Sequence, residues 1–219
     1  MRNFIFDFNG TLFRDSPMLM KSWQLYLGQF GINVTEEMFH KYMCGPPNTV
    51  TIKHYIGEGR TDEEIRRMGE EKELFYRKII LDDPSLQHLI EGAPEMFDML
   101  KARGVPFAIA TGSIRSNCDF YIEVLHIDKW FDYDHIFYAE GDLPGKPDPA
   151  IYRLAMQKLG FKPEETVVVE DSLIGIESAV GAGVKSVIAI DSTMGAEAFH
   201  GIPEVIDVIH NYRNFERFL

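Results

Sequence analysis

The chain has 219 residues, of which 45% are hydrophobic and 26% charged, the proportions of a globular protein with a sizeable core. Its 22 basic and 34 acidic residues give a net charge of −12, so no surface for nucleic acid or an anionic membrane is expected. We expect a cytoplasmic protein, because no run of eighteen apolar residues appears, Asp7 comes too early for a cleavable leader, and Cys44 and Cys118 form no C-x-x-C pair.

The first predicted strand is the apolar run NFIFDF (3–8), which overlaps the stretch DFNGT (7–11). Asn-Gly after an apolar run commonly indicates a tight hairpin turn. An Asp at the end of a buried strand is, alternatively, a common place for a reactive carboxylate. No pairing strand follows in the sequence, which favours the second interpretation.

Residues 16 to about 91 contain no convincing strand and are predicted to form an inserted helical cap. The first predicted helix has an apolar face made of Leu19, Trp23, Tyr26, Leu27 and Phe30. A later helix is predicted after the capping box Thr61–Glu64, with an apolar face made of Ile65, Met68, Phe75 and Ile79.

The rest of the chain alternates predicted strands and helices. Pro94 lies near the start of one helix that Gly104 follows, and Asp148-Pro149 opens another that Gly160 closes. This alternation predicts an α/β fold, a Rossmann-like doubly wound parallel sheet formed by residues 1–15 and 92–219. The strands are predicted at PFAIA (106–110), HIFYA (135–139), TVVVE (166–170) and SVIAI (186–190).

Polar residues follow four of these strands at their carboxyl ends, where ligands bind in open α/β sheets. They are Asp7 after the first strand, Thr111 after the second, Lys146 in the loop after the third, and Glu170 and Asp171 at the end of the fourth. Each alone is more often a turn, capping or solvated residue. Together they favour a phosphoryl-transfer site, in which carboxylates hold Mg²⁺ while a lysine and a helix N-terminus bind phosphate.

With these residues the chain resembles the haloacid dehalogenase superfamily over essentially its full length. The resemblance is to the branch with a helical cap, as in phosphoglycolate phosphatase-like and β-phosphoglucomutase-like members. The resemblance implies a Mg²⁺-dependent phosphatase that acts on a small phosphorylated metabolite through an aspartyl phosphate, with the cap closing to exclude water. It rests on DFNGT (7–11), the apolar strand into TGS (109–113), GKPDP (145–149) and VVVEDS (167–172).

By that resemblance Asp7 is the nucleophile, and Gly10 permits a tight turn close to the ligand. Thr111 and the N–H groups of Gly112 and Ser113 would hold the phosphoryl oxygens.

The resemblance assigns Lys146 to bridge Asp7 and the phosphate. Mg²⁺ would be bound by Asp7, Asp171 and the backbone carbonyl of Asn9, with Glu170 acting directly or through water.

Position 9 departs from the family pattern. Phosphatase members have an Asp there that protonates the leaving group and then activates water, whereas Asn9 cannot transfer a proton. Such acid–base catalysis is typically worth about 10²–10⁴ in rate, or roughly 3–5 kcal/mol. Four explanations stay open: a leaving group that needs little protonation, an acid from elsewhere such as the cap, an Asp-to-Asn change that deamidation could partly reverse, or a non-catalytic phosphate-binding relative.

The cap offers two candidate substrate residues, Asn48 and Lys72. Lys72 lies on the apolar stripe, where it either extends to solvent or meets a substrate anion, as a lysine does in phosphoglucomutase-like relatives. A carbon–phosphorus hydrolase, which uses a cap lysine to form a Schiff base with its substrate, is a less favoured alternative. Asn48 stands where that lysine would lie, and Lys53 comes later in the sequence. Arg14, Leu19 and Asn48 also depart from the mutase pattern.

Overall fold

The computed structural model describes residues 2–141 and 143–219, which form two compact units. The core unit comprises Met1–Arg14 and His88–Leu219, and the helical unit comprises Asp15–Gln87. The chain thus leaves the core unit one residue earlier, and returns to it four residues earlier, than the sequence predicted.

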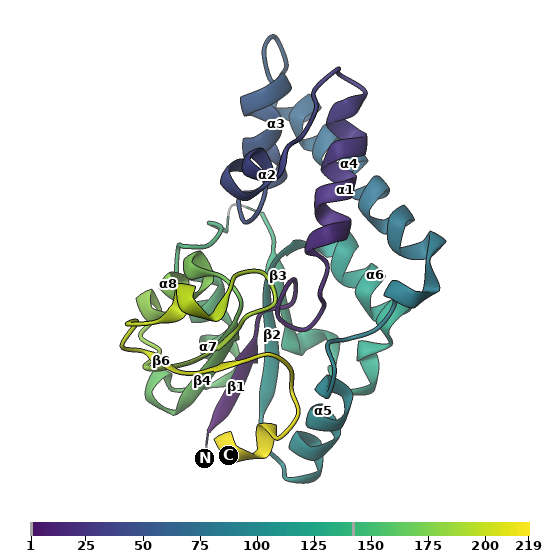
Figure 1. Cartoon of the computed structure of the whole chain (residues 1–219). Helices are drawn as coiled ribbons and strands as arrows, with labels where there is room; N and C mark the ends of the chain where they lie inside the picture. The colour runs from purple at the N-terminus through teal and green to yellow at the C-terminus, as the bar shows by residue number, and fades with distance from the viewer. Residues whose placement is uncertain (1, 142) are drawn as a thin grey trace. The chain divides into compact units, whose positions relative to one another are not determined.

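The core unit is built on a six-stranded parallel sheet with the order β3-β2-β1-β4-β5-β6 (Figure 1). The strand order reverses at β1, so the crevice for a ligand is expected beyond the carboxyl ends of β1 and its neighbours. The predicted α/β, Rossmann-like class is therefore confirmed. The strands are β1 (Asn3–Phe6), β2 (Phe107–Ile114), β3 (Ile136–Ala139), β4 (Thr166–Glu170), β5 (Ser186–Ile190) and β6 (Val205–Ile209).

Three strand predictions need correction. β1 ends at Phe6 and not at residue 8, because the backbone turns after Asp7, and β2 continues to Ile114, beyond the predicted end at residue 110. β6 was not predicted at all, because this edge strand carries Asp207 in its middle and only its last residue, Ile209, is buried.

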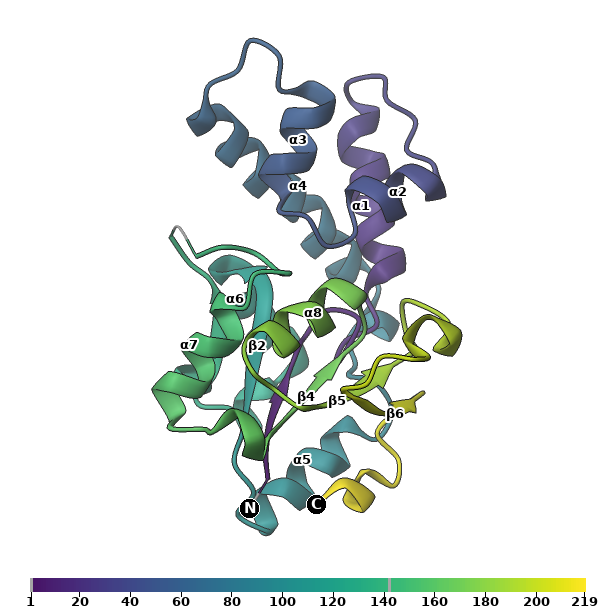
Figure 2. The same ribbon diagram turned by 90° about the vertical axis from the view of Figure 1, so that its left-hand side faces the viewer.

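Helices cover both faces of the sheet, with α5 and α6 on one side and α7 and α8 on the other (Figures 1 and 2). Successive residues of β1 serve the two faces: Ile5 belongs to the apolar cluster that includes α7 and α8, whereas the Phe6 ring packs on Phe97 of α5 at 5.4 Å. This explains why the strand sequences lack alternation. The helices are α5 (Ala93–Ala102), α6 (Arg115–Leu125), α7 (Ala150–Leu159) and α8 (Leu173–Gly181).

The helical unit contains no strand, as predicted, and its helices pack around Trp23, Tyr26, Leu27 and other buried residues. The capping box predicted at Thr61–Glu64 is present at the start of α4. The helices are α1 (Ser16–Gly28), α2 (Glu36–Tyr42), α3 (Asn48–Ile56) and α4 (Asp62–Asp82).

Two details of the predicted apolar faces are wrong. Phe30 lies beyond the end of α1 and is 42% exposed. On α4 Phe75 packs against the apolar core of the unit as predicted, although it is only half-buried. Ile79 is also only half-buried, and the apolar residues that are fully buried in this part of the helix are Tyr76 and Ile80, because the 3.6-residue period rotates the buried face along this long helix.

The two chain segments that connect the units interact with each other within the core unit. The backbone N–H of Ile90 donates to the carbonyl of Leu12 at 2.8 Å, so the outgoing and returning segments are hydrogen-bonded to each other within the core unit. Among the described helices of both units, none has the length and apolar character that crossing a membrane requires.

Candidate active site

Asp7 occupies the first position after β1, and its N–H donates to the carbonyl of Val169 in β4 at 3.0 Å. The chain then folds into a tight loop, in which Gly10 donates to the carbonyl of Phe13 at 2.8 Å. Gly10 has a φ of +77°, and a Cβ there would overlap the Asp171 carboxylate. Glycine is therefore required both for the turn and for the approach of this acid.

Three carboxylates meet at this edge of the sheet. Ligand oxygens of Asp7, Glu170 and Asp171 lie within 4.8 Å of one another, and all three side chains are buried. The sequence placed these acids at the carboxyl ends of β1 and β4, which are neighbouring strands in the sheet. We refer to the three residues as the acidic cluster.

Lys146 lies against the acidic cluster, as the sequence predicted. Its Nζ donates to Asp7 Oδ1 and to Glu170 Oε1, both at 2.6 Å, and it approaches the carbonyl of Ala110 at 3.3 Å. The Tyr152 hydroxyl lies 3.0 Å from the same nitrogen. The ammonium therefore bridges carboxylates that follow two different strands.

Burial and mutual repulsion strain the charges of the acidic cluster. Burial raises the pKa of Asp7 to about 7, with the Lys146 ammonium opposing the rise and the Glu170 carboxylate adding to it. Burial, Glu170 and Asp7 together raise the pKa of Asp171 well above its usual range. Burial would lower the pKa of Lys146, but Asp7 and Glu170 hold it well above its ordinary value.

The residues present suit a hard divalent cation. Three carboxylates against one ammonium leave excess negative charge when all are ionised, and carboxylate oxygens are the ligands that Mg²⁺ and Ca²⁺ prefer. No other group of three or more His, Cys, Asp or Glu side chains with this spacing occurs among the described residues.

Both oxygens of Glu170 are held in place. Oε1 accepts from Lys146 and from the Tyr152 hydroxyl at 2.9 Å, and Oε2 accepts from the Ser172 N–H and hydroxyl. A Cβ at Gly175 would overlap the Glu170 carboxylate. Sequence reasoning missed Tyr152 and Gly175, although each follows a recognised motif by one helical turn.

Asn9 is fixed by hydroxyl groups from β2 and α6. Its Oδ1 accepts from Ser113 Oγ at 2.6 Å and lies 3.4 Å from Thr111 Oγ1, while its Nδ2 donates to the Tyr121 hydroxyl at 2.8 Å. Tyr121 is buried and stacks on Phe8, with ring centroids 4.3 Å apart. Nothing in the sequence indicated Tyr121, because the contact spans 112 residues.

The predicted phosphate-binding residues lie at the same sheet edge. Thr111 is buried within β2, Gly112 is exposed and Ser113 is half-buried. The Ser113 N–H, which the resemblance assigned to a phosphoryl oxygen, donates to Thr111 Oγ1 at 3.1 Å. Their role toward phosphate stays a prediction.

The two cap candidates, Lys72 and Asn48, share one hydrogen-bond partner inside the helical unit. Lys72 Nζ donates to Glu73 Oε1 at 2.8 Å, and Asn48 Nδ2 donates to the same oxygen. Lys72 also lies over the Trp23 ring, 4.9 Å from its centroid, and is fully buried. The expectation that Lys72 extends to solvent is wrong, because Glu73 supplies a buried partner.

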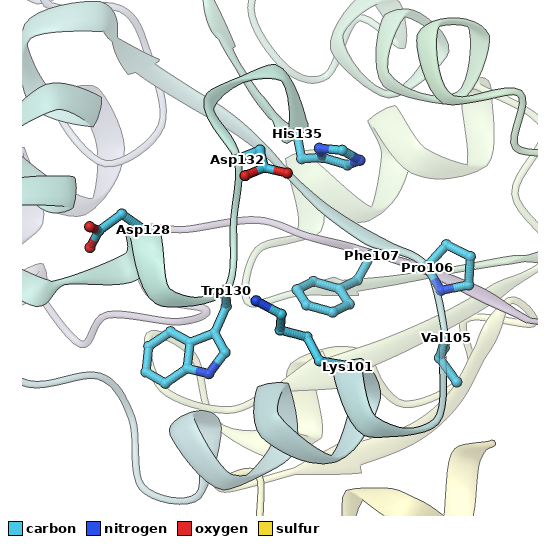
Figure 3. Close-up of a pocket in the computed structure, with 8 residues that line it drawn as sticks. All are labelled: Lys101, Val105, Pro106, Phe107, Asp128, Trp130, Asp132 and His135. Carbon is cyan, nitrogen blue, oxygen red and sulfur yellow. The ribbon is translucent and has the colours of Figure 1, made fainter.

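A separate hollow of about 270 Å³ lies at the amino end of β2 (Figure 3). Phe107, the first residue of β2, and the preceding Val105 and Pro106 line it, so it belongs to the edge of the sheet opposite the acidic cluster. The other lining residues are Lys101, Asp128, Trp130, Asp132 and His135. The hollow is therefore no part of the candidate active site.

Comparison with known proteins agrees with this geometry. A hydrolase described as HAD family IA, variant 3, from Entamoeba histolytica has a solved structure that matches with a TM-score of 0.88 and 34% identity, covering 97% of this chain and 94% of that one. The phosphorylated carbohydrates phosphatase of Thermotoga maritima is 25% identical over 87% of this chain and 85% of its own length. Pyrophosphatase PpaX of Oceanobacillus iheyensis is 26% identical over 95% of both.

The family model described as haloacid dehalogenase-like hydrolase matches residues 4–189, which include the acidic cluster and Lys146. The helical unit is inserted directly after the first motif, between β1 and β2. The chain is therefore a hydrolase that belongs to the haloacid dehalogenase-like family, in its branch with a helical cap.

Proposed function

We propose that this hydrolase is a Mg²⁺-dependent phosphatase of small phosphorylated metabolites that acts through Asp7 and works best on leaving groups that depart without protonation. The observation that carries the proposal is the bridge from Lys146 to Asp7 and Glu170 beside Asp171. The relatives named phosphorylated carbohydrates phosphatase and pyrophosphatase support the substrate class.

In the first step a carboxylate oxygen of Asp7 attacks the phosphorus, and the bond to the leaving group breaks with its electron pair going to that group. In the second step water attacks the phosphorus of the aspartyl phosphate, which releases phosphate and restores the Asp7 carboxylate. Lys146 pairs with Asp7 throughout, and its charge offsets that of the incoming phosphate.

Mg²⁺ would be held by Asp7, Asp171 and Glu170 with the backbone carbonyl of Asn9, and when bound it neutralises phosphate oxygens. Thr111, Gly112 and Ser113 would bind the phosphoryl oxygens that face away from Lys146. The excess negative charge of the acidic cluster supports the metal assignment, because burial without a cation penalises the ionised acids.

The amide at position 9 decides the leaving group. Neither end of Asn9 can release a proton to a departing alkoxide, so esters of ordinary alcohols lose the assistance of a general acid. Acyl phosphates and pyrophosphate have leaving groups that are weak bases, and their first step needs no such acid. We therefore place anhydrides ahead of sugar-phosphate esters.

Deamidation of Asn9 offers little remedy in the folded state. The reaction needs the Gly10 nitrogen to attack the Asn9 side-chain carbonyl, but the Gly10 N–H is bonded to the carbonyl of Phe13 and the amide is held by Ser113 and Tyr121. The chain is thus expected to work with an amide.

A carbon–phosphorus hydrolase receives no support from the two candidate lysines of the helical unit, Lys53 and Lys72. The ammonium of Lys53 pairs with Asp62 at 2.7 Å on the surface, and that of Lys72 is buried against Glu73.

A substrate panel tests the proposal. Phosphate release with Mg²⁺ is measured on acetyl phosphate, pyrophosphate and several sugar phosphates, for the wild type and for Asp7→Ala. We expect turnover that is faster on the anhydrides, and none above background with Asp7→Ala. Absence of turnover on every compound, with stabilisation of the fold by phosphate, would support the non-catalytic binding alternative instead.

A further inference from the structure

The loop that follows β5, residues 191–195, reaches the acidic cluster although no sequence motif marks it. β5 lies beside β4, with Ala189 paired to Glu170, so the loop emerges next to Asp171. The Ser192 hydroxyl donates to the backbone carbonyl of Gly10, which joins this loop to the tight loop of residues 7–13 after β1, here called the nucleophile loop.

Thr193 of the same loop contacts the Asp171 carboxylate. Its hydroxyl forms a hydrogen bond to that side chain. The space next to the Gly10 Cα, which a Cβ would fill, is taken by Asp171 Oδ2 and by Thr193 Oγ1, the latter 2.7 Å from that point. The carboxylate and the hydroxyl therefore pack side by side against the nucleophile loop.

Asp171 is held by a second threonine. Thr11 Oγ1 donates to Asp171 Oδ1 at 3.2 Å, and the Asp171 side chain is buried. Two hydroxyls, one from the nucleophile loop and one from the loop after β5, thus restrain rotation of one carboxylate. A carboxylate that binds a cation needs such restraint, because its partners set the direction of its oxygens.

We propose that Thr193 is a positioning residue for the metal site, whose hydroxyl holds the Asp171 carboxylate in the orientation that binds the divalent cation. The inference rests on the proposed function, which makes Asp171 a ligand of Mg²⁺. Loss of a hydrogen-bond partner of a metal ligand typically lowers metal affinity by about 10–100-fold.

Calorimetric titration of the metal-free protein with Mg²⁺, without substrate, tests the role of Thr193. Thr193→Val keeps the branched shape and removes the hydroxyl, so we expect the dissociation constant to rise by about 10–100-fold. Thr193→Ser keeps the hydroxyl and should bind Mg²⁺ nearly as the wild type does.

The matched control is Thr166→Val. Thr166 is also buried, but its hydroxyl donates to the carbonyl of Lys162 at 2.8 Å at the amino end of β4, away from the acidic cluster. This variant should change the melting temperature without changing the Mg²⁺ dissociation constant. Melting curves in chelator establish that each variant is folded, and Thr193→Ala replaces Thr193→Val if the valine does not fit.

Two results would overturn the role of Thr193 while leaving the proposed function intact: Thr193→Val binding Mg²⁺ as tightly as the wild type, or Thr193→Ser binding as weakly as Thr193→Val. Failure of the proposed function has a different signature. In that case the wild type shows no Mg²⁺ binding, or Asp171→Asn leaves the binding unchanged, and both proposals fall together.

Discussion

One lysine in each unit, the partly buried Lys146 and the fully buried Lys72, makes contacts of the same kinds, but the two clusters differ in their balance of charge. Lys146 is 2.6 Å from a carboxylate and 4.8 Å from the centre of the Tyr152 ring, and Lys72 is 2.8 Å from a carboxylate and 4.9 Å from the centre of the Trp23 ring. Lys146, however, bridges two carboxylates beside a third, whereas Lys72 pairs with the single carboxylate of Glu73.

The difference lies in what each cluster still needs. A one-to-one buried pair is close to neutral and can serve the fold alone. Three carboxylates with one ammonium are stable in a buried site only with a further cation or with proton uptake, and the raised pKa of Asp7 reflects that need. Uncompensated buried charge therefore distinguishes the acidic cluster from the Lys72–Glu73 pair.

The largest expected effect on activity comes from Asn9→Asp, which replaces the amide near the acidic cluster with a carboxyl group. The new carboxyl group can protonate the leaving group in the first step, so kcat/KM on a sugar phosphate should rise by about 10²–10⁴, while kcat/KM on acetyl phosphate changes little. Initial-rate measurements on both substrates check this. If Asn9→Asp and the wild type had the same rates on both substrates, our interpretation of position 9 would be contradicted.

A second substitution refines this test. Ser113 and Tyr121 can turn their hydroxyls to donate to the new carboxylate, which would lower its pKa and leave less of it protonated to act as a general acid. Adding Tyr121→Phe to Asn9→Asp removes one such donor, so the alkaline limb of the profile of kcat/KM against pH should move to higher pH. The phenyl ring preserves the stacking on Phe8.

Next in size is removal of the bridging ammonium by Lys146→Met. Loss of a charged partner at the reacting group should lower kcat by about 10²–10³. Steady-state kinetics at saturating Mg²⁺ provides the measurement, and near-wild-type kcat in a folded variant would argue against a role for Lys146 in the reaction.

Lys72→Met is the counterpart in the helical unit. It leaves Glu73 buried without its cation, so urea denaturation should show a loss of about 3–5 kcal/mol in unfolding free energy with unchanged kcat. Lys72→Met combined with Glu73→Gln should recover much of this loss. A raised KM with unchanged stability would instead support the substrate contact that the sequence predicted for Lys72.

The smallest effect is on pH-dependent stability without metal. The pKa of Asp7 is raised to about 7 in the folded state, so its contribution to stability is complete below the ordinary value of 3.8 and is lost as the pH rises through 7. In chelator, urea denaturation should show the wild type losing on the order of 1–3 kcal/mol between pH 5 and pH 8. Asp7→Asn should flatten this dependence, and an identical slope would exclude Asp7 as its source.

The sequence predicted that the acidic cluster and Lys146 lie together, but not the residues around them, for a topological reason. Parallel strands bring their carboxyl ends to one edge, so Asp7, Lys146 and Asp171 could be placed together without any distance. Tyr121 and Thr193 could not, because their contacts depend on how α6 and the loop after β5 pack.

The errors in the predicted fold also arise where long-range packing, and not local sequence, decides the structure. β6 was missed because a half-exposed edge strand with a central Asp207 lacks the continuous apolar run of its neighbours. The burial of Lys72 was missed because only packing shows that Glu73 and Trp23 surround it. Local patterns did predict the capping box at Thr61, where the interacting groups are three residues apart.

The hydrogen bond between Ile90 and Leu12 has a consequence for how this architecture can change over time. Because the two connecting segments are hydrogen-bonded to each other within the core unit, the geometry of the sheet does not depend on the length of chain between them. The entropic cost of closing that loop also grows only slowly with its length. Residues 15–87 can therefore be lengthened, shortened or exchanged as one block while the nucleophile loop keeps its geometry. Such an anchor lets the helical unit diverge in sequence independently of the acidic cluster.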